Sequence, residues 1–261
     1  GVDTPNAWPR LLEEELANLI SFKNIEVLNF AITGYGPKQY VSVVSHFTPI
    51  YKPDLIVIET FVNDFQDAVW SNEDFQRSIG FGLPDQDGLY SILRIEHLRR
   101  WMQLSIFERL KETLRNQPNS EGYFLGNFST LERGKIDIHS EASAIVHQSL
   151  QEIASTAKQV GAKVIIFMVP ASVQVCSSAD LPYYPRNIDL SDASSYDINN
   201  PQKVMAEIAA SLNIPFYDLR EPLKTSDTCP YQPHNMHWLK EGHELVSQYI
   251  AKVLLSGGYI H

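Results

Sequence analysis

Residues Asp54 to Asp64 read DLIVIETFVND, and this stretch constrains the fold more than any other part of the chain. Leu55 to Ile58 form an unbroken apolar run that follows Pro53, is rich in β-branched residues and is too short for an independent helix. Such a run is typical of a strand buried on both faces, as in the middle of a parallel sheet. The stretch therefore predicts an α/β protein organised around a central parallel sheet.

The end of this stretch turns polar at Asn63 and Asp64. In open α/β sheets, ligands bind beyond the carboxyl ends of the strands, so polar residues there are candidates for a site. The Asn63 amide is a donor that could stabilise a developing oxyanion. Asn and Asp are also common in turns that end strands, and these two residues alone favour the turn.

Composition limits the class of protein and its partners. The chain has 261 residues, 44% hydrophobic and 20% charged, which suits one large α/β domain over residues 1–261. Its 21 basic and 31 acidic residues give a net charge of -10, which disfavours nucleic acid and anionic membrane surfaces as partners. No apolar run approaches the length of a membrane span, and no signal peptide is recognisable, although a removed leader before Gly1 stays open.

Two cysteines, Cys176 and Cys229, lie in loop-like sequence and could pair. They have neither CxxC nor His-rich spacing, so they carry no metal signature. Cysteine usage leaves the compartment open, with an extracytoplasmic location favoured, and composition does not decide the oligomeric state.

The rest of the chain alternates between helical and strand-like patterns. Apolar spacing predicts helices over 8–20, 37–47, 91–117, 141–160, 201–212 and 239–255, and strands over 25–31, 163–169 and 214–217. Pro37 is placed to open the second helix and Gly161 to end the fourth. Right-handed crossovers make successive strands of such a chain parallel. The pattern loosens between residues 65 and 135, which predicts an insertion after the central strand that borders a site.

Three stretches fall at the carboxyl ends of predicted strands: Gly34, Asn63 and the segment YQPHNMHWLKEG at 231–242. Gly34 in a tight turn can present its backbone N–H to a ligand next to a helix N-terminus. In the third stretch, His234 and His237 stand beside Trp238 just ahead of a helix, which is the position of a catalytic base above a sheet edge.

Other uses of these residues have less support. His234 and His237 form an i,i+3 pair without a third ligand in view, so a metal site is disfavoured. Gly34 and Gly36 are followed by Pro37, and no ribose-binding acid stands at the right place, unlike a dinucleotide-binding fingerprint. We therefore expect neither a metal nor a cofactor.

Taken together, the three stretches resemble the SGNH or GDSL-type serine hydrolases. The second block of that family is similar to residues 29–34 (NFAITG), the third to 61–64 (FVND) and the fifth to 235–243 (NMHWLKEGH). The order and spacing of the blocks are more specific than any one of them, and the resemblance runs from Gly1 to about Leu255. It changes the interpretation of Asn63 from a turn residue to a site residue.

This resemblance implies a flavodoxin-like three-layer α/β/α sandwich with a central parallel sheet. It assigns the binding of the oxyanion to the Gly34 N–H and the Asn63 side chain, and the role of base to His237. Trp238 and Asp64, which adjoin these residues in the sequence, are expected to contact the substrate.

Two departures from the family pattern concern the catalytic residues. The Gly-Asp-Ser block with the nucleophile is absent, and the helix that follows this block in the family is similar to residues 2–12, so we expect the nucleophilic serine upstream of Gly1. The family also places an Asp two or three residues before its His, where this chain has Asn235 and His234. An Asn can orient the imidazole but cannot stabilise its protonated form, so Asn235, a backbone carbonyl or Asp227 would have to serve instead.

The implied reaction is hydrolysis of a small-molecule or glycan ester through a serine acyl-enzyme. Transfer of the acyl group to a polysaccharide hydroxyl uses the same residues, so an O-acyltransferase is the first alternative. A non-catalytic homologue that binds glycans or partners is the second. The residues encoded upstream of Gly1 would separate an enzyme from a binding protein.

Overall fold

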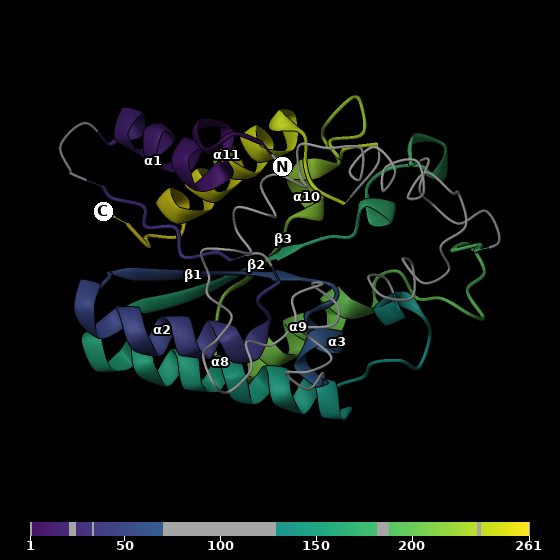
Figure 1. The fold of residues 1–261 in the computed structure, drawn as a ribbon, viewed down its shortest axis with the longest axis horizontal. Helices are drawn as coiled ribbons and strands as arrows, with labels where there is room; N and C mark the ends of the chain where they lie inside the picture. Colours follow the sequence, from purple (N-terminus) through teal and green to yellow (C-terminus); the bar gives the residue numbers. More distant parts are fainter. Residues whose placement is uncertain are drawn as a thin grey trace, which may run out of the picture.

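A parallel sheet forms the middle layer of the structure, a computed structural model that describes residues 2–20, 25–32, 34–69, 129–181, 188–233 and 236–260 (Figure 1). Within these ranges the strands are β1 (Leu55–Phe61), β2 (Lys163–Val169) and β3 (Phe216–Asp218), in the spatial order β1-β2-β3. β1 and β2 pair along their whole length, and Phe61 lies opposite Val169 at their carboxyl ends. The prediction of an α/β fold with a parallel sheet is confirmed.

Helices cover both faces of this sheet and complete a three-layer α/β/α sandwich (Figure 1). One face carries α2 (Pro37–Tyr51), α3 (Asp64–Val69), α8 (Glu141–Val160) and α9 (Asn200–Ser211), and the other carries α1 (Trp8–Leu19), α10 (Arg220–Leu223) and α11 (Lys240–Ser256). Short 3₁₀ turns η1 (Thr4–Asn6), η2 (Ser129–Leu131), η3 (Ser172–Gln174) and η4 (Ser178–Asp180) connect them.

Alternate side chains of each strand enter two separate hydrophobic cores. Ile58 and Ile166 pack with α2, α8 and α9, whereas Ile165 and Phe167 pack on the opposite face with α1 and α11. Because both faces are covered, both sets of alternating positions must be apolar. This is the physical reason for the unbroken apolar runs in β1 and β2.

Most predicted elements occur within one or two residues of their expected bounds. The helix at Glu141–Val160 and the strand at Lys163–Val169 have the bounds that the pattern predicted. Pro37 is the first residue of α2, and Gly161 follows α8 with a φ of 80°. That left-handed conformation strains any residue with a Cβ, so glycine is the usual choice after a helix.

The prediction of a strand over Ile25–Ala31 is wrong. Residues 25–32 form no strand, and within the described chain β1 has a ladder partner only on its β2 side. Alternating apolar residues make a strand only where a neighbour completes the ladder. Here the segment packs by its side chains, with the Val27 N–H donating to Glu13 Oε2 at 2.8 Å and the Phe30 ring stacked on Phe47.

The insertion predicted over 65–135 stays a prediction, because the structure describes only its two ends, 65–69 and 129–135. The chain turns directly from β1 into the helix α3, in which Phe65 and Ala68 are fully buried in the core. Six residues are too few to show a helical period, so the sequence pattern did not predict α3. Residues 70–128, with the predicted helix over 91–117, lie outside the described residues.

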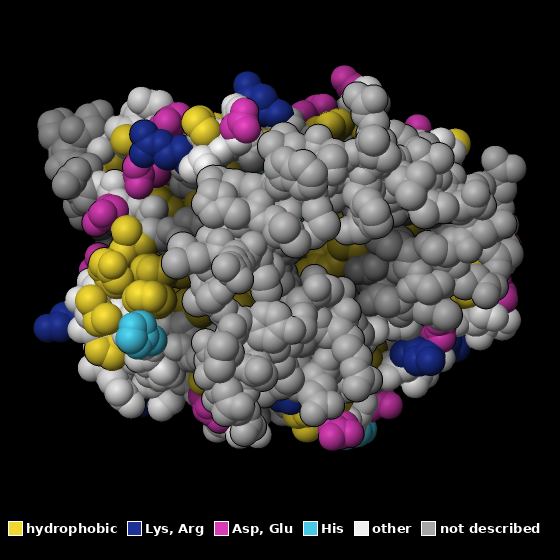
Figure 2. All heavy atoms as spheres, viewed as in Figure 1, with side chains coloured by type: hydrophobic (Ala, Val, Ile, Leu, Met, Phe, Trp, Pro, Cys, Tyr) yellow, Lys and Arg dark blue, Asp and Glu magenta, His cyan; other side chains and the backbone are white. Residues whose placement is uncertain are grey.

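Hydrophobic side chains also gather on one face of the molecule, at the left of Figure 2 beside a histidine. Among the described residues, the exposed large apolar side chains include Ile50 and Tyr51 at the C-terminal end of α2, and Leu28 and Ile32 in the segment whose Phe30 ring packs against Tyr51. Within the described residues, no helix combines the length and apolar character that crossing a membrane requires.

Candidate functional site

Asn63 lies at the carboxyl end of β1, where the chain enters α3. Its backbone carbonyl accepts the N–H groups of Gln66 and Asp67 at 2.8 and 2.9 Å, which starts the helix. The half-buried side-chain amide has no hydrogen-bond partner among the described residues. Asn63 therefore begins α3 through its backbone and keeps its amide donor available for another role.

The glycine turn before α2 packs directly against α3. Gly34 has a φ of 83°, and the backbone N–H of Gly36 donates to Gln39 Oε1 at 3.2 Å. A Cβ built on Gly36 would lie 3.1 Å from the Asp67 Cβ, so the turn and the helix approach closely at this point. The structure thus brings the Gly34 turn next to the helix that Asn63 begins.

Asp64 is 2% exposed and holds the same corner together. Its carboxylate accepts the Tyr40 hydroxyl at 3.2 Å and the Phe61 N–H at 3.3 Å. Burial, and then the nearby charge of Asp67, raise the pKa of Asp64 well above its usual range. These contacts join α2, β1 and α3. The contact between Asp64 and the substrate, which the sequence predicted, stays a prediction.

Two further carboxyl groups with perturbed pKa values stand beside this corner. Burial raises the pKa of Glu59, on β1, to about 7, and the hydrogen bond from the Trp8 indole opposes that shift. Burial likewise raises the pKa of Asp67 to about 7. A glutamate within the apolar run of β1 is a signal that sequence reasoning could have used, because buried carboxyls are rare outside sites and ion pairs.

The raised pKa of Asp67 predicts how stability changes with pH. An unfolded Asp has a pKa of about 4, so between about pH 4 and 7 the folded chain holds a proton that the unfolded chain releases. The free energy of unfolding therefore falls as the pH rises through this range. We expect Asp67→Asn, which removes this ionisation, to be more stable than wild type by roughly 1–3 kcal/mol at pH 8 and by much less at pH 5.

Urea unfolding of both proteins at pH 5 and pH 8 measures this difference. Glu207→Gln, at an exposed position of α9, is the matched control and should show no such change. A stability gain of Asp67→Asn that is equal at the two pH values would contradict the assignment.

His237 lies in the loop that precedes α11, and backbone hydrogen bonds join the two arms of this loop. Tyr231 and Trp238 form an antiparallel bridge, and the Gln232 N–H donates to the His237 carbonyl at 2.8 Å. Gly242, at the start of α11, allows close packing, because a Cβ there would lie 2.9 Å from both the Pro230 carbonyl and the Trp238 Cβ. The loop is therefore a narrow hairpin set against the first turn of the helix.

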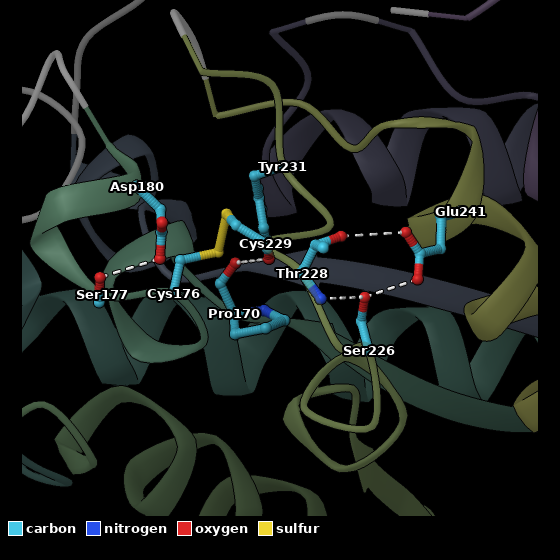
Figure 3. Close-up of a disulfide and its surroundings, with 9 residues drawn as sticks. All are labelled: Pro170, Cys176, Ser177, Asp180, Ser226, Thr228, Cys229, Tyr231 and Glu241. Atoms are coloured by element: carbon cyan, nitrogen blue, oxygen red, sulfur yellow. Dashed lines mark hydrogen bonds between the residues drawn. A yellow bond between two sulfur atoms is a disulfide. The ribbon is translucent and has the colours of Figure 1, made fainter.

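Two links fasten this hairpin to the carboxyl end of β2 (Figure 3). The buried Tyr231 hydroxyl donates to the Pro170 carbonyl at 2.8 Å, one residue past the end of the strand. The Cys176–Cys229 disulfide joins the same two regions of the chain, so the two cysteines, whose pairing the sequence left open, are bonded. Because Val169 lies opposite Phe61, the hairpin is anchored beside the strand end that leads to Asn63.

The environment of His237 favours a neutral imidazole. Its side chain reaches solvent, but partial burial lowers the pKa of His237 below its usual value, and burial also lowers the pKa of His243. A neutral histidine is the form that can accept a proton as a base. Trp238 is only 6% exposed and packs edge-on against Tyr231 and His243, so its predicted contact with substrate stays a prediction.

The structure brings some of the sequence-predicted residues together. The turn at 34–36 contacts α3 at Asp67, in the helix that begins at Asn63, and the hairpin with His237 is fastened to the adjacent strand end. Asn235 and His234 lie outside the described residues, so the orientation of the His237 ring by Asn235 stays a prediction. Among the described residues, no three His, Cys, Asp or Glu side chains form a group that could hold a metal ion.

Comparison with known proteins adds little to this picture. No protein-family model matches the chain, and a sequence search of curated proteins gave no match. The chain is similar to the crystal structure of TesA at 16% sequence identity and a TM-score of 0.49, with 96% of this chain and 89% of TesA covered. A likeness at this level carries no argument about function, which must come from the chain's own residues.

Proposed function

We propose that this protein is an ester hydrolase of the SGNH type, which cleaves a carboxylic ester through a serine acyl-enzyme. One observation carries the proposal: the helix α3, which begins at Asn63 and is contacted by the turn at 34–36, and the hairpin with His237 follow or are fastened to the adjacent carboxyl ends of β1 and β2. This edge is where α/β folds place their ligands. Backbone and amide donors on one side and a neutral imidazole on the other are what acyl transfer requires.

The nucleophile in this proposal is a serine N-terminal to residue 2, where the resemblance to the family puts it. η1 and the first turn of α1 lie beside α11, and the Trp8 N–H donates to His243 in the first turn of that helix. A segment that precedes η1 would therefore start close to the hairpin with His237. That location supports a serine within reach of the imidazole.

The reaction proceeds in two halves. In the first, His237 takes the proton of the serine hydroxyl as its oxygen attacks the ester carbonyl, and the Gly34 N–H and the Asn63 amide hold the resulting oxyanion. His237 then protonates the leaving alcohol as the C–O bond breaks. In the second half, His237 deprotonates a water that attacks the acyl-enzyme, and then returns the proton to the serine oxygen as the acyl C–O bond breaks, which releases the acid and regenerates the serine hydroxyl. Asn235 or a backbone carbonyl would orient the ring.

Active-site labelling tests this proposal directly. A fluorophosphonate reacts with an activated serine, which displaces fluoride and retains the phosphonyl group. We expect one labelled serine in the native full-length protein, located by peptide mass spectrometry in the segment before Val2. Protein unfolded in urea should not react, because the serine is activated only beside its base.

Absence of labelling in the native protein would leave a non-catalytic binding protein as the better interpretation. Labelling at Ser129, Ser172, Ser226 or Ser256 would contradict the proposed position of the nucleophile. The protein would still be a serine hydrolase in that case. The disulfide fits an oxidising compartment, so the assay protein is best prepared without reductant.

A further inference from the structure

Trp8, the first residue of α1, donates two hydrogen bonds to distant parts of the chain. Its backbone N–H points to His243 Nδ1 at 3.4 Å, across 235 residues of sequence. Its indole Nε1–H points to Glu59 Oε2 at 3.0 Å, across 51 residues. One residue thus contacts α11 and β1 at the same time.

Both acceptors belong to segments that carry residues of the proposed site. Glu59 lies on β1, four residues before Asn63, which follows the end of that strand. His243 lies in the first turn of α11, six residues after His237, and its ring packs edge-on against Trp238 with the centroids 5.3 Å apart. Trp8 therefore connects the strand that leads to the oxyanion donor with the hairpin that carries the base.

We propose that Trp8 is a positioning residue, which holds the His237 hairpin in register with the Asn63 end of β1 through His243 and Glu59. This inference rests on the proposed hydrolase function and extends it to a residue that contacts neither substrate nor reacting atoms. Acyl transfer depends strongly on the placement of base and oxyanion donors, and a displacement of about 1 Å can lower turnover about a hundredfold.

The surroundings of the indole bond make it a firm link. Glu59 is half-buried, and burial is the main cause of its raised pKa. A hydrogen bond to a carboxyl group in such a place is stronger than one at the surface, and loss of the donor leaves the acceptor unpaired. The general packing of α1 on α11 keeps the helices together, whereas the two bonds of Trp8 fix where the start of α1 meets α11 and β1.

Conservative variants of the full-length protein test the role of Trp8. Trp8→Phe keeps an aromatic ring and the backbone N–H but removes the indole donor. We expect kcat for a nitrophenyl acetate to fall about 10- to 100-fold with little change in KM, because turnover depends on the placement of the reacting groups. Glu59→Leu, which removes the acceptor, should give the same loss.

The double variant and the matched controls separate positioning from general destabilisation. Trp8→Phe combined with Glu59→Leu should be no slower than either single variant, because both remove one bond. Glu59→Gln retains an acceptor oxygen and should keep most of the activity. Tyr249→Phe removes another side-chain donor of α11, to Glu221 Oε2 at 3.0 Å, and should leave kcat unchanged.

Unchanged kcat in folded Trp8→Phe and Glu59→Leu would overturn the proposal, as would equal losses in Glu59→Gln. An inactive wild type would refute the proposed hydrolase without deciding the role of Trp8. In that event the imidazole ring protons of His237, followed by NMR, decide it. They should shift in Trp8→Phe and Glu59→Leu but not in Tyr249→Phe, and unshifted signals would overturn the positioning role.

Discussion

Replacement of His237 by alanine is expected to lower kcat for hydrolysis of a nitrophenyl acetate by about a hundred- to ten-thousand-fold. A serine hydroxyl is a weak nucleophile until a base within hydrogen-bond reach accepts its proton, and general-base catalysis contributes on this scale. The loss should appear in kcat far more than in KM, since the imidazole acts on the transition state and not on bound substrate. Steady-state kinetics on the full-length protein measure both constants.

The pH dependence of kcat/KM in the wild type tests the role of His237 independently. Partial burial lowers the pKa of His237, so its neutral form is present at pH 7 and is lost as the pH falls through that lowered value. The value of kcat/KM should therefore rise with pH below about 6.5 and level off above it. His139→Ala, at an exposed loop position, is the histidine control and should match wild type.

Equal activity of His237→Ala and wild type would rule out the proposed mechanism.

Replacement of Asn63 by alanine is expected to lower kcat by about a hundred- to a thousand-fold. Loss of one preorganised donor to the oxyanion has this effect in hydrolases, because the donor acts on charge that develops only in the transition state. The variant should fold normally, since α3 begins at the Asn63 backbone carbonyl and not at its side chain. Thermal unfolding should therefore show little change while kcat falls.

Asn63→Asp is the informative partner of this variant. A carboxylate is nearly isosteric with the amide but only accepts hydrogen bonds when ionised, so it would repel the oxyanion instead of stabilising it. We expect its kcat to be at least as low as that of Asn63→Ala. Full activity in either variant would remove Asn63 from the oxyanion site and would leave Gly34 as its only proposed donor.

The sequence by itself determined the elements and the order in which they follow one another. The helix at 141–160 and the strand at 163–169 could be predicted, because the spacing of apolar residues within each segment indicates which face is buried. The same local logic placed Asn63 at the carboxyl end of β1 and His237 ahead of the last helix, whereas Gly34 follows a segment that forms no strand. Parallel pairing of β1 followed from its unbroken apolar run.

Only the tertiary structure decided which segments meet. The segment at 25–31 has the apolar composition of a strand, but a ladder needs a neighbour, and in the described chain none pairs with it. The pairing of Cys176 with Cys229, and the contacts of Trp8 with Glu59 and His243, join residues between 51 and 235 positions apart. Spacing within a segment carries no information about such partners, because they are selected by the packing of whole layers against one another.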